Sequence, residues 1–411
     1  MRLLYRLLLR LALPFILMRL VWRGRRQPAY LRHWAERFGF VEKGSPGSLW
    51  IHAVSVGETR AAEPLTRALR QQYPGVPVLL TCMTPTGRDT AMQLFGDAVT
   101  VNYLPYDLAP ALTRFLRVHQ PRLCVLMETE LWPELIHQCR LHSVPVYVVN
   151  ARLSERSAKR YGFAPRFIAS VVAEIATIAA QSEADAGRFR ALGATRVEVT
   201  GNLKFDRGPS EQDLNRGAAF RQRMGGRSTV LAASTRQGEE APLLRAWRDS
   251  ADYDAVLVVV PRHPQRFDEV AELIQQAGLS FQRRSDERPL QPGTQVWLGD
   301  SMGEMFSYFA AADVALIGGS FEPLGGQNLL EACAVGTPVV VGPHMFNFTE
   351  ATQLAVQAGA ALQAQSARDA MQMAIELLRD GPRCQAMGAA GRALLATHQG
   401  ATQRTLRLLG V

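Results

Sequence analysis

Acidic side chains in the amino-terminal half of the chain follow short apolar runs, where they could accept a proton. Glu58 follows HAVSVG at 52–57, and Glu128 and Glu130 follow RLCVLM at 122–127. A carboxylate at the start of a helix is often only a favourable charge near the helix dipole. The functional alternative is a general base that takes a proton from a substrate hydroxyl. We expect the dipole to keep Glu58 ionised, so that it is available as a base without being a strong one.

Two basic residues occupy comparable places in the same half. Arg88 ends the segment TPTGR at 84–88, and Lys204 lies in GNLKFD at 201–206. Cations at strand ends can hold an acidic group such as a sugar carboxylate or a lipid phosphate. Each residue alone is typical of a structural role, but their recurrence at the ends of successive predicted strands indicates a site.

A glycine-rich cluster, GGSFEPLGGQNLLEACAVGTPVVVGPHMFNF, occupies 318–348 in the other half. Its glycines permit positive φ and close backbone approach, and we expect a helix to open near Gln327 or Asn328. The free N–H groups at such a helix start suit an anionic phosphate. Glu331, one turn into the helix, could accept hydrogen bonds from a ribose hydroxyl pair. Glycines that serve only tight turns are the structural alternative.

Two further junctions in this half carry groups suited to a nucleotide. VVVPRHPQRF at 258–267 ends a predicted strand with Arg262, whose planar guanidinium matches phosphate oxygens. GDSMGEMFSYF at 299–309 contains glycines at a second junction, where the backbone of 302–304 could contact a base or phosphate. A surface turn stiffened by prolines is the alternative for the first junction.

Short β-branched runs alternate with helical patterns from residue 49 onwards, which indicates parallel strands joined by crossover helices. The first series of predicted strands covers 49–56, 76–82, 98–104, 122–128, 144–150, 176–182 and 196–202. The second covers 228–234, 254–261, 294–300, 312–319 and 337–343, before amphipathic helices near 367–379 and 381–409. Two such α/β units predict ligand binding at the carboxyl ends of their strands, in a shared crevice.

The composition is that of a folded, basic protein. The 411 residues are 47% hydrophobic, and 46 Lys and Arg against 37 Asp and Glu give a net charge of +9. This balance favours phosphates, nucleic acid or acidic membranes, with a solvated basic face as the plain alternative. The five scattered cysteines predict neither a disulfide framework nor a zinc site. Since the sequence has no HExxH pattern and no DxD pair follows a predicted strand, a metal-independent site is favoured.

The amino terminus is basic and rich in leucine. Arg2, Arg6 and Arg10 are four residues apart and predict a cationic stripe along one side of a helix, with Leu and Ile around the rest. A secretory signal fits poorly, because arginines interrupt the apolar run and follow it at 23–26. We expect a helix at a membrane surface. A tilted span with snorkelling arginines and an ordinary buried helix are the alternatives.

The segments HAVSVGE, ETELWP, GNLKFD, PRHP and GGSF…GGQNLLE…GPHMFNF together resemble those of the Kdo transferases, the 3-deoxy-D-manno-octulosonic acid transferases of lipopolysaccharide biosynthesis. The similarity runs through nearly the whole chain. It implies the GT-B architecture, an α/β fold of two facing Rossmann-like domains. The implied parts are a membrane-associating segment at 1–26, an acceptor domain at 27–206, a linker at 207–227 and a CMP-Kdo-binding domain at 228–411, whose last helices are free to cross to the acceptor domain.

The resemblance also implies residue roles. Glu58 is the expected proton acceptor, while Glu128 and Lys204 are the expected transition-state stabilisers, and Arg88 is a candidate contact for Kdo or a lipid phosphate. The residues expected to bind CMP-Kdo are Pro261, Arg262, Met302, Gly303, Glu304, Asn328, Leu329, Leu330 and Glu331. This chain departs from many relatives, which carry His and Pro where it has Gln327 and Leu329. The departure bears on loop geometry and acceptor contacts more than on the donor site.

The predicted reaction is the inverting transfer of Kdo from CMP-Kdo to a tetraacyl lipid A precursor (lipid IVA), without metal or cofactor. The predicted place is the cytoplasmic face of the inner membrane, whose anionic surface is an expected partner, and no nucleic acid is expected. Another GT-B nucleotide-sugar glycosyltransferase or an epimerase is the alternative among enzymes. A non-catalytic basic module that binds membrane or nucleic acid is the alternative from another class, and its binding would fall steeply with salt.

Overall fold

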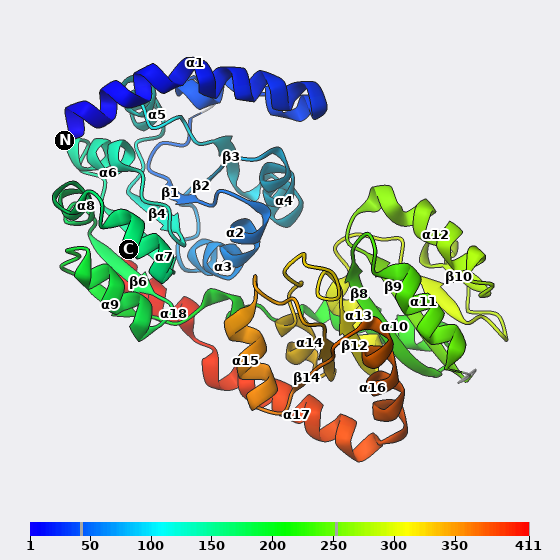
Figure 1. The fold of residues 1–411 in the computed structure, drawn as a ribbon. Coiled ribbons are helices and arrows are strands. Elements are labelled where there is room, and N and C mark those ends of the chain that lie inside the picture. The colour runs from blue at the N-terminus through cyan, green and yellow to red at the C-terminus, as the bar shows by residue number, and fades with distance from the viewer. Residues whose placement is uncertain (42–43, 251–253, 411) are drawn as a thin grey trace. The chain divides into compact units, whose positions relative to one another are not determined.

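The computed structural model describes residues 1–41, 44–250 and 254–410, which form two compact units (Figure 1). Unit 1 comprises Met1–Asp206 and Gln399–Val411, and unit 2 comprises Arg207–His398. Each unit contains one seven-stranded sheet whose paired strands are all parallel. The predicted pair of parallel α/β units is therefore confirmed.

The sheet of unit 1 has the order β3-β2-β1-β4-β5-β6-β7, so the chain reverses direction across the sheet between β1 and β4. Its strands are β1 (Leu49–His52), β2 (Val78–Cys82), β3 (Thr100–Tyr103), β4 (Leu123–Met127), β5 (Val146–Ala151), β6 (Thr177–Ala180) and β7 (Val197–Val199). In such sheets ligands bind beyond the carboxyl ends of the strands, near the point of reversal. All seven were predicted, with longer bounds.

Helices cover both faces of this sheet, because neighbouring strand residues point to opposite sides. Leu49 and Ile51 pack with α3 and α18, whereas Trp50 packs with α5 and α6. The helices of unit 1 are α1 (Arg2–Arg26), α2 (Val56–Ala61), α3 (Glu63–Gln72), α4 (Pro85–Phe95), α5 (Ala109–His119), α6 (Pro133–Leu141), α7 (Glu155–Tyr161), α8 (Pro165–Val172), α9 (Glu183–Ala191) and α18 (Ala401–Leu409). Short 3-10 segments add η1 (Pro28–Leu31), η2 (Trp34–Phe38), η3 (Gly96–Ala98) and η4 (Leu203–Asp206).

The sheet of unit 2 has the order β10-β11-β9-β8-β12-β13-β14. Its strands are β8 (Ser228–Thr235), β9 (Ala255–Pro261), β10 (Phe281–Arg283), β11 (Val296–Leu298), β12 (Val314–Ile317), β13 (Val339–Val341) and β14 (Ala361–Gln363). The sequence did not predict β10 and β14. Both are three-residue edge strands that include polar residues, so they lack the long β-branched run that identified the others.

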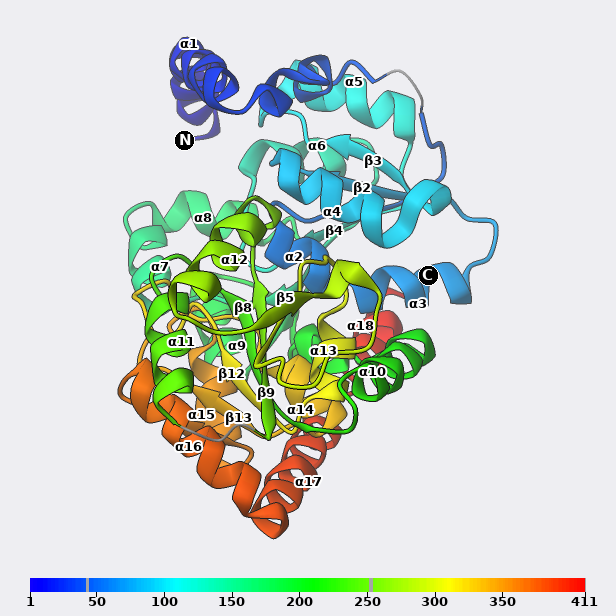
Figure 2. The same cartoon turned by 90° about the vertical axis from the view of Figure 1, so that its right-hand side faces the viewer.

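Helices α11, α12 and α16 pack on one face of this sheet, and α10 and α13 lie on the other (Figure 2). On this second face, Phe220 of α10 and Tyr308 of α13 pack around Trp297. The helices of unit 2 are α10 (Glu211–Arg223), α11 (Glu240–Asp249), α12 (Phe267–Gln276), α13 (Met305–Ala311), α14 (Leu330–Val335), α15 (Thr349–Gln357), α16 (Ala367–Arg379) and α17 (Gly381–His398). Unit 2 also contains the 3-10 segments η5 (Pro264–Arg266) and η6 (Arg284–Asp286). The stretch 207–227, expected to be a linker, contains α10.

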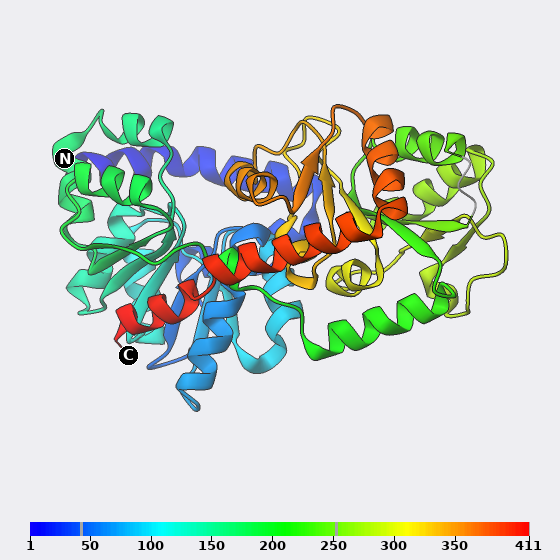
Figure 3. The ribbon, with the colours of Figure 1, turned by 90° about the horizontal axis from the view of Figure 1, so that it is seen from below.

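Two predicted helices begin or end elsewhere. The helix expected near Gln327 or Asn328 begins at Leu330, because the Asn328 side chain accepts a hydrogen bond from the Leu330 N–H at 3.2 Å and so turns the chain ahead of the helix. The single helix expected over 381–409 is divided at Gly400, which has a φ of +93°. The second part, α18, belongs to unit 1 and packs beside α3 (Figure 3).

Candidate functional site

Glu58 lies at the carboxyl edge of the unit 1 sheet, in the first turn of α2. Its carboxylate folds back on the loop after β1, where it accepts hydrogen bonds from the Val54 N–H at 2.7 Å and the Ser55 hydroxyl at 3.4 Å. Burial, together with the negative charges of Glu130 and Glu128, raises the pKa of Glu58 to about 8 against the lowering effect of the Val54 bond. The expectation that the helix dipole keeps Glu58 ionised is therefore wrong, because burial outweighs the dipole of a six-residue helix.

Glu128 and Lys204, which are far apart in the sequence, form an ion pair at the same edge. The Lys204 Nζ lies 3.2 Å from the Glu128 Oε1, and the two side chains are 27% and 24% exposed. Glu128 has a φ of +56°, which turns the chain sharply as β4 ends. The segment of Lys204 is fixed by the Asn150 side chain, which accepts a hydrogen bond from the Leu203 N–H at 3.0 Å. The structure thus brings two of the predicted site residues together.

Glu130 completes a group of three neighbouring carboxyl groups. Burial raises the pKa of Glu130, and the charge of Glu128 raises it further. Like charges held close together in a partly buried place resist ionisation, so Glu58, whose pKa is raised to about 8, retains its proton near neutral pH. Such a group suits proton transfer.

Arg88 has a protein partner in this structure. Its guanidinium lies 2.8 Å from the Glu36 carboxylate, which also accepts a hydrogen bond from the Tyr103 N–H at 2.6 Å. Arg88 and Arg37 both approach the Tyr103 ring, at 5.2 and 4.0 Å from its centroid. This arrangement gives Arg88 a structural role, and its contact with a substrate stays a prediction.

His52, in the same motif as Glu58, was not singled out from the sequence. It is fully buried, and its Nδ1 lies 3.0 Å from the Thr81 hydroxyl. Burial lowers the pKa of His52 to about 4, so the ring is neutral at physiological pH. Its ring contacts Trp132 edge to face at 6.4 Å between centroids, which joins the motif of Glu58 to that of Glu128.

Glu239 organises the glycine-rich loop of unit 2 and was also missed from the sequence. Only 1% of the residue is exposed, and its carboxylate accepts hydrogen bonds from the N–H groups of Arg236 (2.8 Å), Gly319 (2.7 Å) and Phe321 (2.9 Å). Burial raises its pKa, although these three bonds favour the charged form. A carboxylate directly after a strand and a glycine, in STRQGEE, was the available signal.

The predicted strand end at Pro261 and Arg262 lies near further arginines, of which Arg266 is paired with Glu240 and Glu269. Burial lowers the pKa of His263, and the charges of Arg236, Arg262 and Arg266 lower it further, so these cations surround the imidazole. The Arg262 N–H donates to the Thr235 carbonyl oxygen at 2.9 Å, which holds the ends of β9 and β8 together. This concentration of positive charge suits an anionic ligand.

The junction at 302–304 is held by arginine. Glu304 accepts two hydrogen bonds from Arg284, both at 3.0 Å, and one from the Ser301 hydroxyl at 2.5 Å. Gly303 has a φ of +80°, a conformation that favours glycine, between the half-exposed Met302 and Glu304. The backbone here is therefore set before any ligand binds.

The predicted nucleotide contacts at 328–331 divide into two kinds. Glu331 forms an ion pair with Arg207 and accepts a hydrogen bond from the Asn328 amide at 3.2 Å. Leu329 and Leu330 are 0% and 2% exposed, so their side chains belong to the core and only their backbone groups can meet a ligand.

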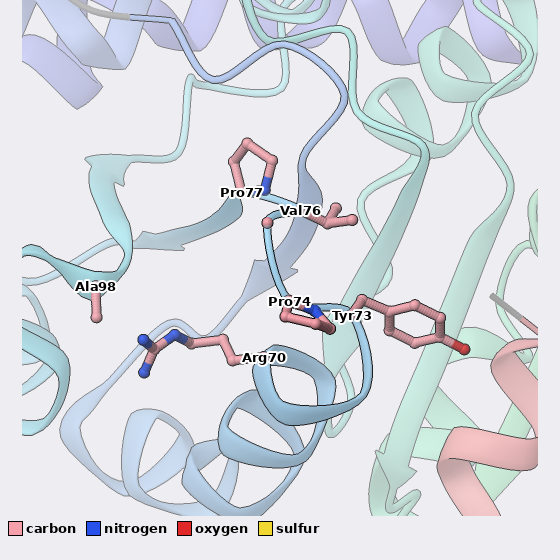
Figure 4. Close-up of a pocket in the computed structure, with 7 residues that line it drawn as sticks. Arg70, Tyr73, Pro74, Val76, Pro77 and Ala98 are labelled. Carbon is pink, nitrogen blue, oxygen red and sulfur yellow. The ribbon is translucent and has the colours of Figure 1, made fainter.

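A pocket in unit 1 lies at the opposite edge of the sheet. It is lined by Arg70, Tyr73, Pro74, Gly75, Val76, Pro77 and Ala98, which precede β2 and β3 (Figure 4). None of the predicted site residues lines it. Among the residues that the structure describes, no group of three or more His, Cys, Asp or Glu side chains is arranged to hold a metal ion.

Helix α1 uses its arginines differently from the expectation. Arg2 pairs with Glu174 at 3.1 Å, and Arg6 pairs with Glu134, whose side chain is fully buried, at 2.8 Å. Two of the three residues of the predicted cationic stripe therefore attach the helix to unit 1. The side chains exposed instead include Leu3, Leu4, Leu7, Leu8, Leu11, Phe15, Met18, Val21 and Trp22. No helix in the described ranges combines the length and apolar character needed to cross a bilayer.

Comparison with known proteins identifies the family. Residues 32–207 match the family model for 3-deoxy-D-manno-octulosonic-acid transferase (kdotransferase), and residues 242–394 match that for glycosyl transferases group 1. A 3-deoxy-D-manno-octulosonic acid transferase of Bordetella pertussis is 44% identical over 98% of this chain and 98% of its own length. This chain belongs to the Kdo transferase family. A Haemophilus influenzae member is 40% identical over 99% of this chain and 98% of its own.

The Kdo transferase is thus an enzyme, a glycosyltransferase of lipopolysaccharide biosynthesis, as its motifs predicted. Its fold is shared with the Anabaena protein HepE solved in complex with UDP, at a TM-score of 0.57 and 14% identity over 88% of this chain and 99% of that one. A putative UDP-N-acetylglucosamine 2-epimerase from Listeria monocytogenes gives a TM-score of 0.55 at 14% identity, covering 88% and 95%. These structures share architecture alone, so the family match decides against an epimerase.

Proposed function

We propose that this Kdo transferase moves Kdo from CMP-Kdo to a tetraacyl lipid A precursor with inversion, using Glu58 as the general base. The observation that carries the proposal is the half-buried Glu58 carboxyl group, whose pKa is about 8, at the carboxyl edge of the unit 1 sheet. A base is most effective when its pKa lies near the working pH, because it is then ionised often enough and still binds the proton firmly. Glu58 meets both conditions.

The proposed step begins with a lipid hydroxyl beside the ionised form of Glu58. As its proton passes to Glu58, the hydroxyl oxygen bonds to the anomeric carbon of Kdo from the side opposite the departing CMP. The bond between that carbon and the phosphate oxygen breaks, and its electron pair leaves with CMP. Neither a metal nor a cofactor is required in this scheme.

The Lys204–Glu128 pair would stabilise the charges that develop in this step. A carboxylate offsets positive charge on the sugar ring, and an ammonium group offsets the Kdo carboxylate or a phosphate. The pair is partly exposed and is held by short backbone segments at the strand ends. Its charges are therefore oriented before the substrate arrives.

We assign the donor to unit 2. Phosphate would lie near Arg262, where Arg236 adds positive charge, whereas Arg266 is already paired with Glu240 and Glu269. The residues assigned to CMP-Kdo are Pro261, Arg262, Met302, Gly303, Glu304, Asn328, Leu329, Leu330 and Glu331, of which the two leucines would act through their backbone. Since Arg207 already pairs with Glu331, a ribose hydroxyl would have to share or replace that contact.

We place the enzyme on the cytoplasmic face of the inner membrane through α1. The exposed leucines and aromatic residues of this helix match the acyl layer, and Arg23, Arg25 and Arg26 in its last turn match anionic headgroups. The inward ion pairs of Arg2 and Arg6 support a helix that lies along the surface, because a spanning helix would have to break them.

The direct test is an incubation of purified enzyme with CMP-Kdo and the tetraacyl lipid A precursor. We expect the lipid to gain the mass of Kdo, with an anomeric configuration opposite to that of the donor when the product is examined by NMR. Transfer to another acceptor only, or retention of configuration, would contradict the proposal.

A further inference from the structure

A basic segment with an exposed aromatic residue follows β5 at the carboxyl edge of the unit 1 sheet. Its cations are Arg152, Arg156, Lys159, Arg160 and Arg166, all of them exposed. None of their side chains forms an ion pair or hydrogen bond among the residues that the structure describes. The acidic residue of this segment, Glu155, lies 3.7 Å from Arg188. We call residues 152–166 the basic segment.

Three of these cations share one face of a short helix. Arg156, Lys159 and Arg160 in α7 are spaced so that each lies three or four residues from a neighbour, which places them side by side. Like charges at this spacing repel one another and destabilise a helix. The helix is seven residues long and is started by the Ser154 hydroxyl, which accepts a hydrogen bond from the Ser157 N–H at 3.2 Å. An anion bound to this face would relieve the repulsion.

Phe163 lies in the turn between α7 and α8 and is 90% exposed. Figure 2 labels these two helices. A single exposed apolar residue has little meaning alone. Phe163, however, lies between Arg160 and Arg166 in the sequence. An apolar ring flanked by cations suits a lipid, because the ring can contact acyl chains while the cations contact phosphate.

The basic segment adjoins the carboxyl groups of the candidate site. The Thr129 hydroxyl, between Glu128 and Glu130, donates a hydrogen bond to the Arg152 carbonyl oxygen. Burial raises the pKa of Tyr161 in α7, and the charge of Glu130 raises it further, so the helix and this carboxylate are close. The start of the basic segment therefore adjoins the loop of Glu128 and Glu130, and a ligand on α7 would lie at the same edge of the sheet as Glu58.

We infer that the basic segment binds a phosphate group of the lipid acceptor, while Phe163 enters its acyl layer. Several cations around one phosphate give strong, directional binding, because each contributes charge-assisted hydrogen bonds. We assign this segment to the acceptor and not to bulk membrane lipid, because it lies beside the carboxyl groups of the candidate site. Helix α1 offers a separate surface for bulk lipid. The inference rests on the proposed function. It adds a phosphate-binding segment that would orient the acceptor hydroxyl.

The test uses the full enzyme with Arg156→Gln, Lys159→Gln and Arg160→Gln combined. We expect KM for a phosphorylated lipid acceptor in detergent micelles to rise about tenfold or more, with KM for CMP-Kdo and kcat nearly unchanged. With the same acceptor stripped of its phosphates, the variant and the natural enzyme should have equal KM values. A matched control removes three exposed cations elsewhere in unit 1, by Arg70→Gln, Arg117→Gln and Arg196→Gln, and should leave both KM values unchanged.

Three outcomes would overturn the inference. The acceptor KM could stay unchanged in the basic-segment variant, the rise could persist with the dephosphorylated acceptor, or the control variant could show the same rise. If the variant instead loses binding to phosphatidylglycerol vesicles without acceptor and keeps its KM in micelles, the segment contacts bulk lipid. Failure of the natural enzyme to transfer Kdo would refute the proposed function itself, whereas normal transfer by both variants would refute only the assignment of this segment.

Discussion

The acidic side chains at the carboxyl edges of the two sheets have different partners. In unit 2, Glu239 accepts three backbone N–H groups, while Glu304 and Glu331 pair with Arg284 and Arg207. In unit 1, Glu58 and Glu130 have raised pKa values, and each is affected by the negative charge of a neighbouring glutamate. The acidic residues named in unit 2 are compensated by arginines or by several backbone N–H groups, whereas Glu58 and Glu130 lie beside other carboxyl groups, of which only Glu128 pairs with a cation, Lys204, in the described part of the chain.

The difference is consistent with an edge in unit 2 that binds the donor and an edge in unit 1 that transfers the proton. A site that binds an anion gains from a backbone fixed in advance, and compensated carboxylates can fix it without adding free negative charge. A site that moves a proton gains from a carboxyl group whose pKa lies near the working pH. Variants of the two edges should therefore fail in different ways.

Loss of the base should give the largest effect. We expect Glu58→Gln to lower kcat by about 10²–10⁴-fold, because the amide cannot accept the proton, while CMP binding stays unchanged. Kdo transfer measured by lipid mass and CMP binding measured by calorimetry check the two halves of this statement. Glu183→Gln, at an exposed residue in α9, is the control. Near-normal turnover in a folded Glu58→Gln variant would contradict the assignment of proton transfer to the edge of unit 1.

The corresponding substitution in unit 2 is Glu239→Gln, which disturbs the hydrogen bonds that fix the glycine-rich loop. The amide keeps one acceptor oxygen and sets an NH2 group against backbone N–H donors, so we expect a loss of about 1–3 kcal/mol in the free energy of unfolding. Weaker CMP binding should accompany it, with little change in the pH dependence of turnover. Thermal unfolding and calorimetry are the measurements, with the exposed Glu376→Gln as control. A shift in the pH profile with unchanged CMP affinity would reverse the expectation.

A double-mutant cycle on Lys204 and Glu128 tests whether the pair acts as a unit. We expect Lys204→Met and Glu128→Gln each to reduce kcat about tenfold or more, and the double variant to lose little beyond either single change. Because the pair is partly exposed, its effect on stability should stay within about 0–1 kcal/mol. Strictly additive losses in kcat would show that the two residues act independently.

The pH profile gives the smallest but most selective test. Since Glu58 must be ionised to act, kcat/KM should rise with pH and level off above a pKa of about 8. Glu130→Gln removes a negative charge that raises the pKa of Glu58, so the rising limb should move to lower pH by on the order of half a unit. Rate measurements between pH 6 and pH 9.5 would show it, roughly spanning this limb. An unmoved limb would mean that Glu58 does not control it.

Much of the fold could be predicted because parallel strands buried on both faces are nearly continuous apolar runs. Strands β1 to β6 of unit 1 and β8, β9, β11, β12 and β13 of unit 2 have this pattern, whereas β10 and β14 do not, and β7 contains the exposed Glu198. The proximity of Lys204 and Glu128 also followed from their places at strand ends, which parallel topology gathers at one edge.

Three-dimensional electrostatics could not be read from the sequence in the same way. The pKa of Glu58 depends on burial and on Glu130, which lies 72 positions further along the chain. The prediction considered only the helix dipole, which burial outweighs. The direction of the α1 arginines depended on buried acidic partners, Glu134 among them, that no local pattern identifies. Glu239 was missed because its partners lie in a distant loop.

The assignment of α18 to unit 1 has a practical consequence for dissecting the enzyme. Asp206, the last residue before unit 2, accepts hydrogen bonds from the N–H groups of Gly400 and Thr402, which lie just after unit 2 ends at His398. Unit 2 is consequently a continuous stretch of the chain that leaves and re-enters unit 1 at neighbouring points. A fragment that stops at Asp206 would leave the apolar contacts of Leu406 and Leu409 unmade, so a separate unit 1 needs the last residues of the chain grafted back to complete its core.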